Sequence, residues 1–295
     1  VRYLASGELA ALLDPSEVEG HDTKWVKREI YEHIGASRFR QRLFHEDGRE
    51  IPDNEIFTVL PNKLQLVVLD FWPPDVEEDM QLILATRNNE LLRMDELLRS
   101  PRDPNQKDEK GYTPLLHAAL EGDLGPVWLL IEAGADIDAR NTELGGMGPM
   151  HLAAMSGHYH LVRFLVEYCP DHQPRAEGGL TPVHFAAKAG HLDVVQLLLS
   201  VEPTWDLPMA DDGSTALHLA SSEGYVDIVR VLLEARADKD QATTDGLRTP
   251  LHFAAQNGHV DTVRLLFEAG VKREPKTAKG STPLFLAACN KHFNV

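Results

Sequence analysis

Short apolar stretches recur along most of the chain at an almost constant interval. The motif Thr-Pro-Leu-His, or a close variant of it, leads into a pair of small residues in each copy, Ala-Ala in all but one. The copies begin at Thr113, Gly148, Thr181, Thr215, Thr249 and Thr282. The intervals between these positions are 35, 33, 34, 34 and 33 residues, and a period of this length predicts an array of one repeated structural unit.

Each copy of the motif predicts a pair of helices. Thr113 is expected to cap the first helix through its hydroxyl, and Pro114 fits the first helical turn, where no amide donor is needed. A glycine such as Gly122 ends this helix, and an apolar stripe such as Val195 and Leu198 marks the second helix. One pair cannot bury both of its apolar faces, so we expect neighbouring pairs to stack and share their stability.

These copies resemble the ankyrin repeat, which implies an all-α solenoid over residues 73–295. A degenerate unit at 76–107 lacks the motif and is expected to cap the array at its N-terminal end. Its two helices are predicted at Met80 to Arg87 and Leu91 to Leu98. Six repeats follow, and the last stops at Val295 where its second helix is expected, so the sequence predicts a truncated repeat in a fragment of a longer protein.

Residues 1–72 do not share the repeat and are predicted to form a separate α+β domain. Strands are predicted at Val1–Ala5, Glu8–Leu13, Gln41–His45 and Lys63–Leu69, with a helix between Val18 and Ile34. This order resembles the ubiquitin-like β-grasp fold. The chain runs on beyond Leu69 without a terminal Gly-Gly, so the resemblance implies docking to a ubiquitin receptor through Phe44 and Val67 rather than conjugation. The alternative is a domain that only covers the N-terminal edge of the array.

Composition and charge narrow the choice of partner and compartment. The chain has 46 acidic and 29 basic residues and a formal charge of −17, which argues against nucleic acid as the main partner. No apolar run approaches the ~20 residues needed to cross a bilayer, so we expect no membrane insertion in this fragment. Two cysteines, Cys169 and Cys289, cannot form a disulfide framework and favour a reducing compartment. We therefore expect a cytoplasmic protein, with the nucleus as the alternative, and a monomer.

The fourteen histidines raise the question of metal binding or catalysis. Most recur in equivalent repeat positions, which predicts hydrogen bonds inside and between repeats. The best remaining metal candidate is the group His151, His158 and His160, which no cysteine or carboxylate completes at zinc-site spacing. The glycines around Gly145 do not match a phosphate or dinucleotide fingerprint, and no nucleophile elbow occurs. The sequence thus predicts no enzyme activity, catalytic residue, metal or cofactor.

The ankyrin resemblance implies a concave binding surface for a protein or peptide, formed by hairpin tips and by exposed positions of the first helices. The predicted contact residues are Glu109, Lys110, Tyr112, Leu120, Glu121, Met147, Met155, Ser156, Leu180, Lys188, Asp212, Ser222, Arg248 and Gln256. These positions are mostly apolar in the first three repeats and polar later, so the partner's anchor is expected over repeats one to three. The alternative is that these apolar side chains pack against neighbouring loops.

Trp128 is the other unusual residue, because the equivalent positions carry Arg163, Gln196, Arg230 and Arg264. It marks either a second contact on the outer face, a seat for the N-terminal domain, or a ring that lies flat on its own helix.

The expected function is a non-enzymatic scaffold or adaptor that binds a protein or peptide, with a second partner at the ubiquitin-like domain. The alternative is a regulatory or targeting fragment of a larger enzyme or channel whose catalytic part lies outside this chain. A third possibility is an enzyme activity at His151, His158 and His160, which would require a bound metal ion.

Overall fold

The computed structural model describes residues 2–4, 26–27, 30, 41–45, 49–52, 64–68, 76–100, 103–168, 174–201 and 211–295. Its internal contacts divide the chain into two units, residues 1–118 with 123–139 and residues 119–122 with 140–295. This division falls inside a helix of the first repeat. The expected boundary between residues 72 and 73 lies outside the described residues and remains a prediction.

The first unit contains a small antiparallel sheet. Its strands are β1 (Arg2–Leu4), β2 (Gln41–His45) and β3 (Leu64–Val68), in the order β1-β3-β2. Leu43 of β2 lies opposite Leu66 of β3, and both side chains are fully buried. Apolar residues that pair across neighbouring strands on one face of a sheet mark the face that packs against the core.

The remaining predicted elements of residues 1–72 are described only in part. Val26 and Ile30, four residues apart, are helical and fully buried, as the helical spacing predicted. The expected strand Glu8–Leu13 lies outside the described residues, and β1 pairs with β3. These elements do not show a β-grasp fold, so the ubiquitin-like assignment is a hypothesis.

Four helices complete the first unit. They are α4 (Val76–Arg87), α5 (Leu91–Arg99), α6 (Pro114–Glu121), whose last three residues belong to the second unit, and α7 (Leu124–Glu132). Helix α4 starts four residues before the predicted Met80. Helix α4 packs on α5, and α5 packs on α7.

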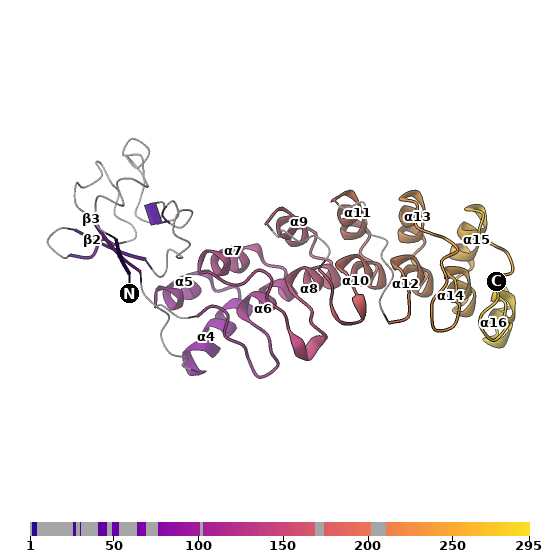
Figure 1. Cartoon of the computed structure of the whole chain (residues 1–295), viewed down its shortest axis with the longest axis horizontal. Helices are drawn as coiled ribbons and strands as arrows, with labels where there is room; N and C mark the ends of the chain where they lie inside the picture. Colours follow the sequence, from indigo (N-terminus) through magenta and orange to yellow (C-terminus); the bar gives the residue numbers. More distant parts are fainter. Residues whose placement is uncertain are drawn as a thin grey trace. The chain divides into compact units, whose positions relative to one another are not determined.

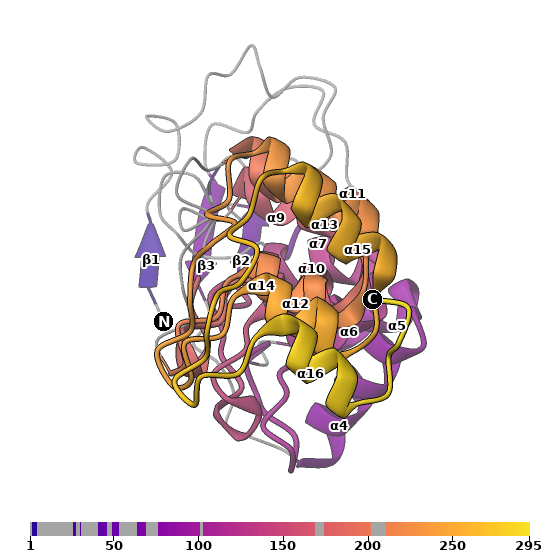
Figure 2. The same cartoon turned by 90° about the vertical axis from the view of Figure 1, so that its right-hand side faces the viewer.

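The second unit is a stack of helix pairs. Its elements are η1 (Thr142–Leu144), α8 (Pro149–Ser156), α9 (Tyr159–Tyr168), η2 (Glu177–Gly179), α10 (Pro182–Ala189), α11 (Leu192–Val201), α12 (Ala216–Glu223), α13 (Val226–Glu234), α14 (Pro250–Gln256), α15 (Val260–Glu268) and α16 (Pro283–Cys289). The first helices of the pairs, α8 to α16 in even numbers, form an inner row, and α9, α11, α13 and α15 form an outer row (Figures 1 and 2).

The motif residues make the core of this stack. Val183, Leu217 and Leu251 occupy the same place in successive inner helices and are at most 1% exposed. The small residues that follow, such as Ala220 and Ala254, are also buried and allow adjacent helices to approach closely. Burying such aliphatic side chains supplies most of the driving force for stacking.

The helix caps differ from the expectation in the middle repeats. Thr113 and Thr282 do cap, because their hydroxyls accept hydrogen bonds from the amides three residues later, at 3.3 and 3.2 Å. In the third repeat, however, the His184 Nδ1 accepts the Thr181 amide at 3.3 Å and lies 2.8 Å from the Thr181 hydroxyl. The fourth and fifth repeats have the same arrangement. In these repeats the histidine therefore supplies the second half of a capping box, because it accepts the amide of the threonine at the N-cap.

Glycine is required where an inner helix ends. Gly122 has φ +86°, and a Cβ at this residue would collide with the His158 ring of the next repeat. At the ends of outer helices, Gly134 and Gly270 have positive φ. Arg236 stands at the equivalent position of another repeat, and its φ of 67° keeps the same left-handed conformation.

Candidate protein-binding surface

Short polar side chains build the hairpins that precede each inner helix. In the second unit, Asn141 Oδ1 accepts the amides of Glu143 and Leu144 at 2.9 and 3.2 Å. Asp212 accepts the amide and the hydroxyl of Ser214, both at 2.8 Å. Such turns mimic a backbone turn and fix the position of the hairpin tips. Asp212, a predicted contact residue, is thus half-buried and engaged in its own hairpin.

The hairpin of the first unit is held in the same way. Asp108 accepts the amides of Lys110 and Tyr112 through Oδ1, and its Oδ2 lies 2.9 Å from His117 Nε2. Burial acts to raise the pKa of Asp108, but the hydrogen bonds from His117 and these amides outweigh it and lower the pKa. The Tyr112 ring stacks on His117 at 4.8 Å between centroids, so part of this predicted anchor is used inside the hairpin.

A column of five side chains follows one position of the inner helices in the second unit. Its members, two residues before the terminal glycine of each inner segment, are Leu120, Met155, Lys188, Ser222 and Gln256. Lys188 is exposed and the other four are half-buried. The column changes from apolar to polar along the array, as the sequence predicted.

Histidines of the following repeat hold the backbone of this column in place. His158 Nε2 lies 2.8 Å from the Leu120 carbonyl, and His191 Nε2 lies 3.0 Å from the Met155 carbonyl. His259 makes the same contact with Ser222 at 2.8 Å. These hydrogen bonds use main-chain oxygens and leave the Leu120 and Met155 side chains available on the surface.

The motif histidines are neutral groups inside the stack. His184 and His218 are at most 1% exposed, and burial lowers the pKa of each to about 4. Burial also lowers the pKa of His252. A neutral ring can accept at Nδ1 and donate at Nε2, and His218 Nε2 accordingly lies 3.1 Å from the Arg248 carbonyl of the next repeat. His252 Nε2 lies 3.3 Å from the Ser281 carbonyl in the same way, so the rings of His218 and His252 each link two repeats.

Comparison with known proteins agrees with this geometry. The family model of ankyrin repeats (3 copies) matches residues 82–177, 169–243 and 236–295. The chain belongs to the ankyrin-repeat family. Its fold is similar to the crystal structure of the human ASB11 ankyrin repeat domain, with a TM-score of 0.63 and 29% identity over 70% of this chain and 90% of that chain.

Two of the curated relatives are much longer than the segment that matches this chain. The potassium channel AKT2/3 of Arabidopsis thaliana is 32% identical over 105 residues, 36% of this chain and 13% of the channel. The Arf-GAP with coiled-coil, ANK repeat and PH domain-containing protein 2 of Mus musculus is 32% identical over 170 residues, 50% of this chain and 21% of that protein. The match to this chain therefore spans less than a quarter of either relative.

Several predicted contact residues of the ankyrin array are engaged with their neighbours. The Arg248 guanidinium lies over the Phe253 ring, 5.7 Å from its centroid. Ser222 accepts hydrogen bonds from Asn257 Nδ2 at its carbonyl and its hydroxyl, at 2.7 and 3.1 Å. The Gln256 carbonyl accepts Asn290 Nδ2 at 2.9 Å. The side chains of Arg248 and Ser222 are therefore engaged inside the array, whereas Gln256 is held here through its main chain only.

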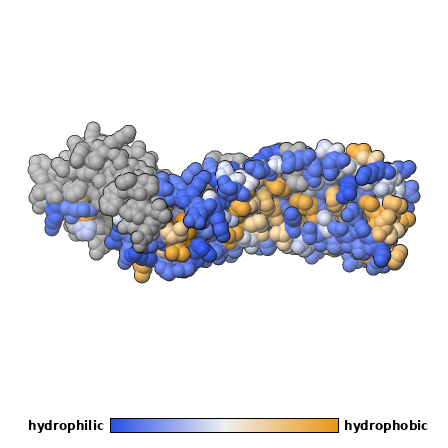
Figure 3. Space-filling view, turned by 90° about the horizontal axis from the view of Figure 1, so that it is seen from below, coloured by the Kyte–Doolittle hydropathy of each residue, from blue (hydrophilic) through white to orange (hydrophobic). Residues whose placement is uncertain are grey.

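The apolar residues of the predicted surface are partly exposed. Leu120, Met147, Met155 and Leu180 of the second unit are all half-buried, with Ser156 beside them and Glu121 exposed. Seen from below, the second unit shows apolar patches among predominantly polar ones (Figure 3). In the first unit, Glu109 and Lys110 are exposed at the hairpin.

The second candidate surfaces remain predictions. Trp128 of α7 is 42% exposed, and Leu124, one turn earlier on the same helix, is 40% exposed. Phe44 and Val67 lie in β2 and β3, where the register places both positions on the same face of the sheet. The structure does not describe the surroundings of these last two.

The metal candidate does not form a ligand set. His151 Nδ1 accepts the Gly148 amide at 3.1 Å and its Nε2 lies 2.9 Å from the Pro174 carbonyl, while His158 bonds to Leu120. His160 is exposed on α9. Among the described residues no group of three or more metal-ligating side chains comes together, and no helix there has the length and apolarity to span a membrane.

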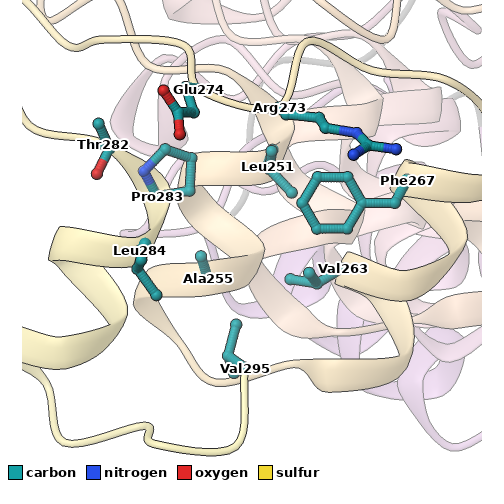
Figure 4. Close-up of a pocket in the computed structure, with 10 residues that line it drawn as sticks. All are labelled: Leu251, Ala255, Val263, Phe267, Arg273, Glu274, Thr282, Pro283, Leu284 and Val295. Atoms are coloured by element: carbon teal, nitrogen blue, oxygen red, sulfur yellow. The ribbon is translucent and has the colours of Figure 1, made fainter.

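Two features of the structure were not predicted from the sequence. One is a pocket of about 260 Å³ between α14, α15 and α16, where Val263, Phe267 and Leu284 line an apolar floor with Arg273 and Glu274 at one side (Figure 4). The residues that line this pocket do not include a set of catalytic side chains. The other is a row of acidic hairpin tips, which a fixed 34-residue interval between acidic residues could have revealed.

Proposed function

We propose that this chain is a non-enzymatic scaffold or adaptor whose ankyrin array binds a protein or peptide on the face of its inner helices. The observation that carries the proposal is the column that begins with Leu120 and Met155. Their carbonyls are fixed by His158 and His191, while their side chains stay partly exposed. Apolar side chains on a rigid backbone bind at a low entropic cost, because little has to be ordered on association.

The surroundings of these two residues support an apolar anchor with a polar rim. Met147 and Leu180, in the adjoining hairpins, are also half-buried, whereas Lys188 continues the column with an exposed charge. Interface cores are enriched in Met and aromatic residues, and charged residues are usually found at the rim. We therefore place the centre of the interface at the apolar end of the column.

A display selection tests this proposal. Peptides selected on the whole chain should bind the double variant Leu120→Ala, Met155→Ala about tenfold or more weakly, because truncation of an interface anchor costs ~2 kcal/mol. Leu92→Ala, a leucine 85% exposed on α5, is the matched control and should not change affinity. Circular dichroism should show that all variants fold. If most selected peptides bind the double variant as tightly as the wild type, the inner face is not the binding surface.

The N-terminal segment adds a second hypothesis. We propose a ubiquitin-like role for it, supported by the resemblance of its element order and by the common face of positions Phe44 and Val67. Titrating the whole chain with a ubiquitin-binding domain tests this. Binding that Phe44→Ala and Val67→Ala abolish would agree with the hypothesis, and no binding would reject it.

A second candidate function is regulation within a larger protein. The matches to a channel and to an Arf-GAP, which this chain covers only in part, favour it. Sequencing the complete reading frame separates the two possibilities, because it either adds further repeats or adds a catalytic or membrane domain.

A further inference from the structure

One position of the hairpin tips is acidic in four successive repeats of the second unit. The residues are Glu143, Glu177, Asp211 and Asp245, each 34 residues after the previous one, and all are exposed. Glu109 occupies the same position in the first unit. Within the described residues none of these carboxylates forms an ion pair, although the chain already carries a net charge of −17.

Backbone contacts tie neighbouring tips into one continuous edge. The Glu177 amide donates to the Gly145 carbonyl at 2.7 Å, and the Thr244 amide donates to the Asp212 carbonyl at 2.7 Å. The acidic side chains follow this edge, since a Cβ at Gly178 would lie 2.7 Å from Asp211 Oδ2. The carboxylates therefore stand in a fixed series along the tips.

The spacing of this series follows from the hairpins. Each repeat adds two passages of the chain, and neighbouring passages in hydrogen-bonded contact lie about 4.8 Å apart, so the carboxylates recur roughly every 10 Å. A peptide in the extended polyproline II conformation has three residues per turn and rises about 3.1 Å per residue, so every third side chain lies on the same side, about 9 to 10 Å from the last. The two periods agree.

We propose that the partner of the inner face is an extended basic segment whose Lys or Arg side chains, at every third position, pair with Glu143, Glu177, Asp211 and Asp245. This deepens the proposed function and rests on it, because the tips border the apolar residues Met147 and Leu180 of the same surface. The row ends in the sixth repeat, where the next 34-residue step reaches Lys279. The change of sign limits the basic segment to about ten residues and sets its register.

Two fluorescent peptides of about twelve residues test the proposal on the whole chain. One has a lysine at every third position, and its isomer has the same lysines in one contiguous block. At low salt we expect anisotropy titrations to give about tenfold tighter binding of the spaced peptide, because several weak exposed ion pairs add up only in the matching register.

Matched variants complete the test. The tip variant Glu177→Gln, Asp211→Asn, Asp245→Asn should abolish the preference for the spaced peptide. The outer-face variant Glu167→Gln, Glu234→Gln, Glu268→Gln removes the same charge and should keep the preference.

Equal binding of the two peptides, equal loss in both variants, or no binding at all would overturn the proposal. The proposed function is judged separately, because peptides that depend on Leu120 and Met155 but carry no spaced cations would uphold it while rejecting the basic segment.

Discussion

Replacing His218 by Asn is expected to make the protein less sensitive to acid. In the folded chain burial lowers the pKa of His218 to about 4, and the same holds for His184, against an ordinary value of 6.5. Between these two pH values the unfolded chain binds a proton that the folded chain does not, so the free energy of unfolding falls as the pH falls. Above pH 6.5 both states are neutral and the contribution is constant.

The size of the effect follows from the two pKa values. One pKa unit corresponds to 1.36 kcal/mol, so the drop from 6.5 to about 4 amounts to about 3 kcal/mol for each histidine at the acid end of the window. Both groups are almost fully buried, so solvent screening does not reduce this figure much. Between pH 7 and pH 4.5 we expect each to account for 2 to 3 kcal/mol, on the order of a third of a typical domain's stability.

Urea unfolding followed by circular dichroism at both pH values measures this loss. Asn can keep the acceptor that His218 Nδ1 offers to the Thr215 amide, so His218→Asn removes the titration and retains the cap. The loss between the two pH values should shrink by 2 to 3 kcal/mol in this variant. His160→Asn, at an exposed histidine, is the control and should match the wild type. If His218→Asn loses as much stability as the wild type, buried neutral histidines do not cause the acid sensitivity.

Two further predictions concern the backbone. Gly122→Ala should destabilise the chain by about 3 kcal/mol, since it adds left-handed strain and a collision with His158, whereas Gly270→Ala, with nothing within 4 Å, should cost only about 1 kcal/mol. Equal losses in thermal unfolding would contradict this account. Arg236→Gly should stabilise by about 0.5 kcal/mol, because glycine relieves the strain of φ 67° but gains unfolded-state entropy. A lower midpoint in urea would refute it.

The motif spacing predicted the helix pairs because each local signal agrees with the next. Pro182, for example, starts α10, the glycine after Ala189 ends it, and Val183, Ala186 and Ala187 between them are buried. The part that His184 takes in the cap at Thr181 was harder to foresee. The spacing Thr-x-x-His is that of a capping box with His in place of Glu, so the sequence did contain a sign of this cap. The contact that such a ring also makes with the next repeat cannot be predicted from the sequence of one repeat alone.

The predicted binding residues show where sequence reasoning stops. The exposure of a side chain could be inferred from its position on the helix, and Leu120 and Met155 are indeed partly exposed. The engagement of Arg248 with Phe253 and of Ser222 with Asn257 depends on side chains more than one turn away or in the neighbouring repeat. The repeat spacing and the helix propensities of the residues carry no information on such contacts. They therefore could not distinguish a residue that binds a partner from one that stabilises the array.

The same contacts explain how one array can vary its partner without losing its fold. Stacking depends on buried motif residues and on hydrogen bonds to main-chain carbonyls such as those of Leu120 and Met155, which any side chain at these positions would leave intact. Replacing Leu120 or Met155 should therefore change recognition more than stability. Ser222 differs, because its own hydroxyl accepts a hydrogen bond from Asn257. Recognition and folding are separable at the apolar end of the column and coupled at its polar end, which is why the anchor belongs at the apolar end.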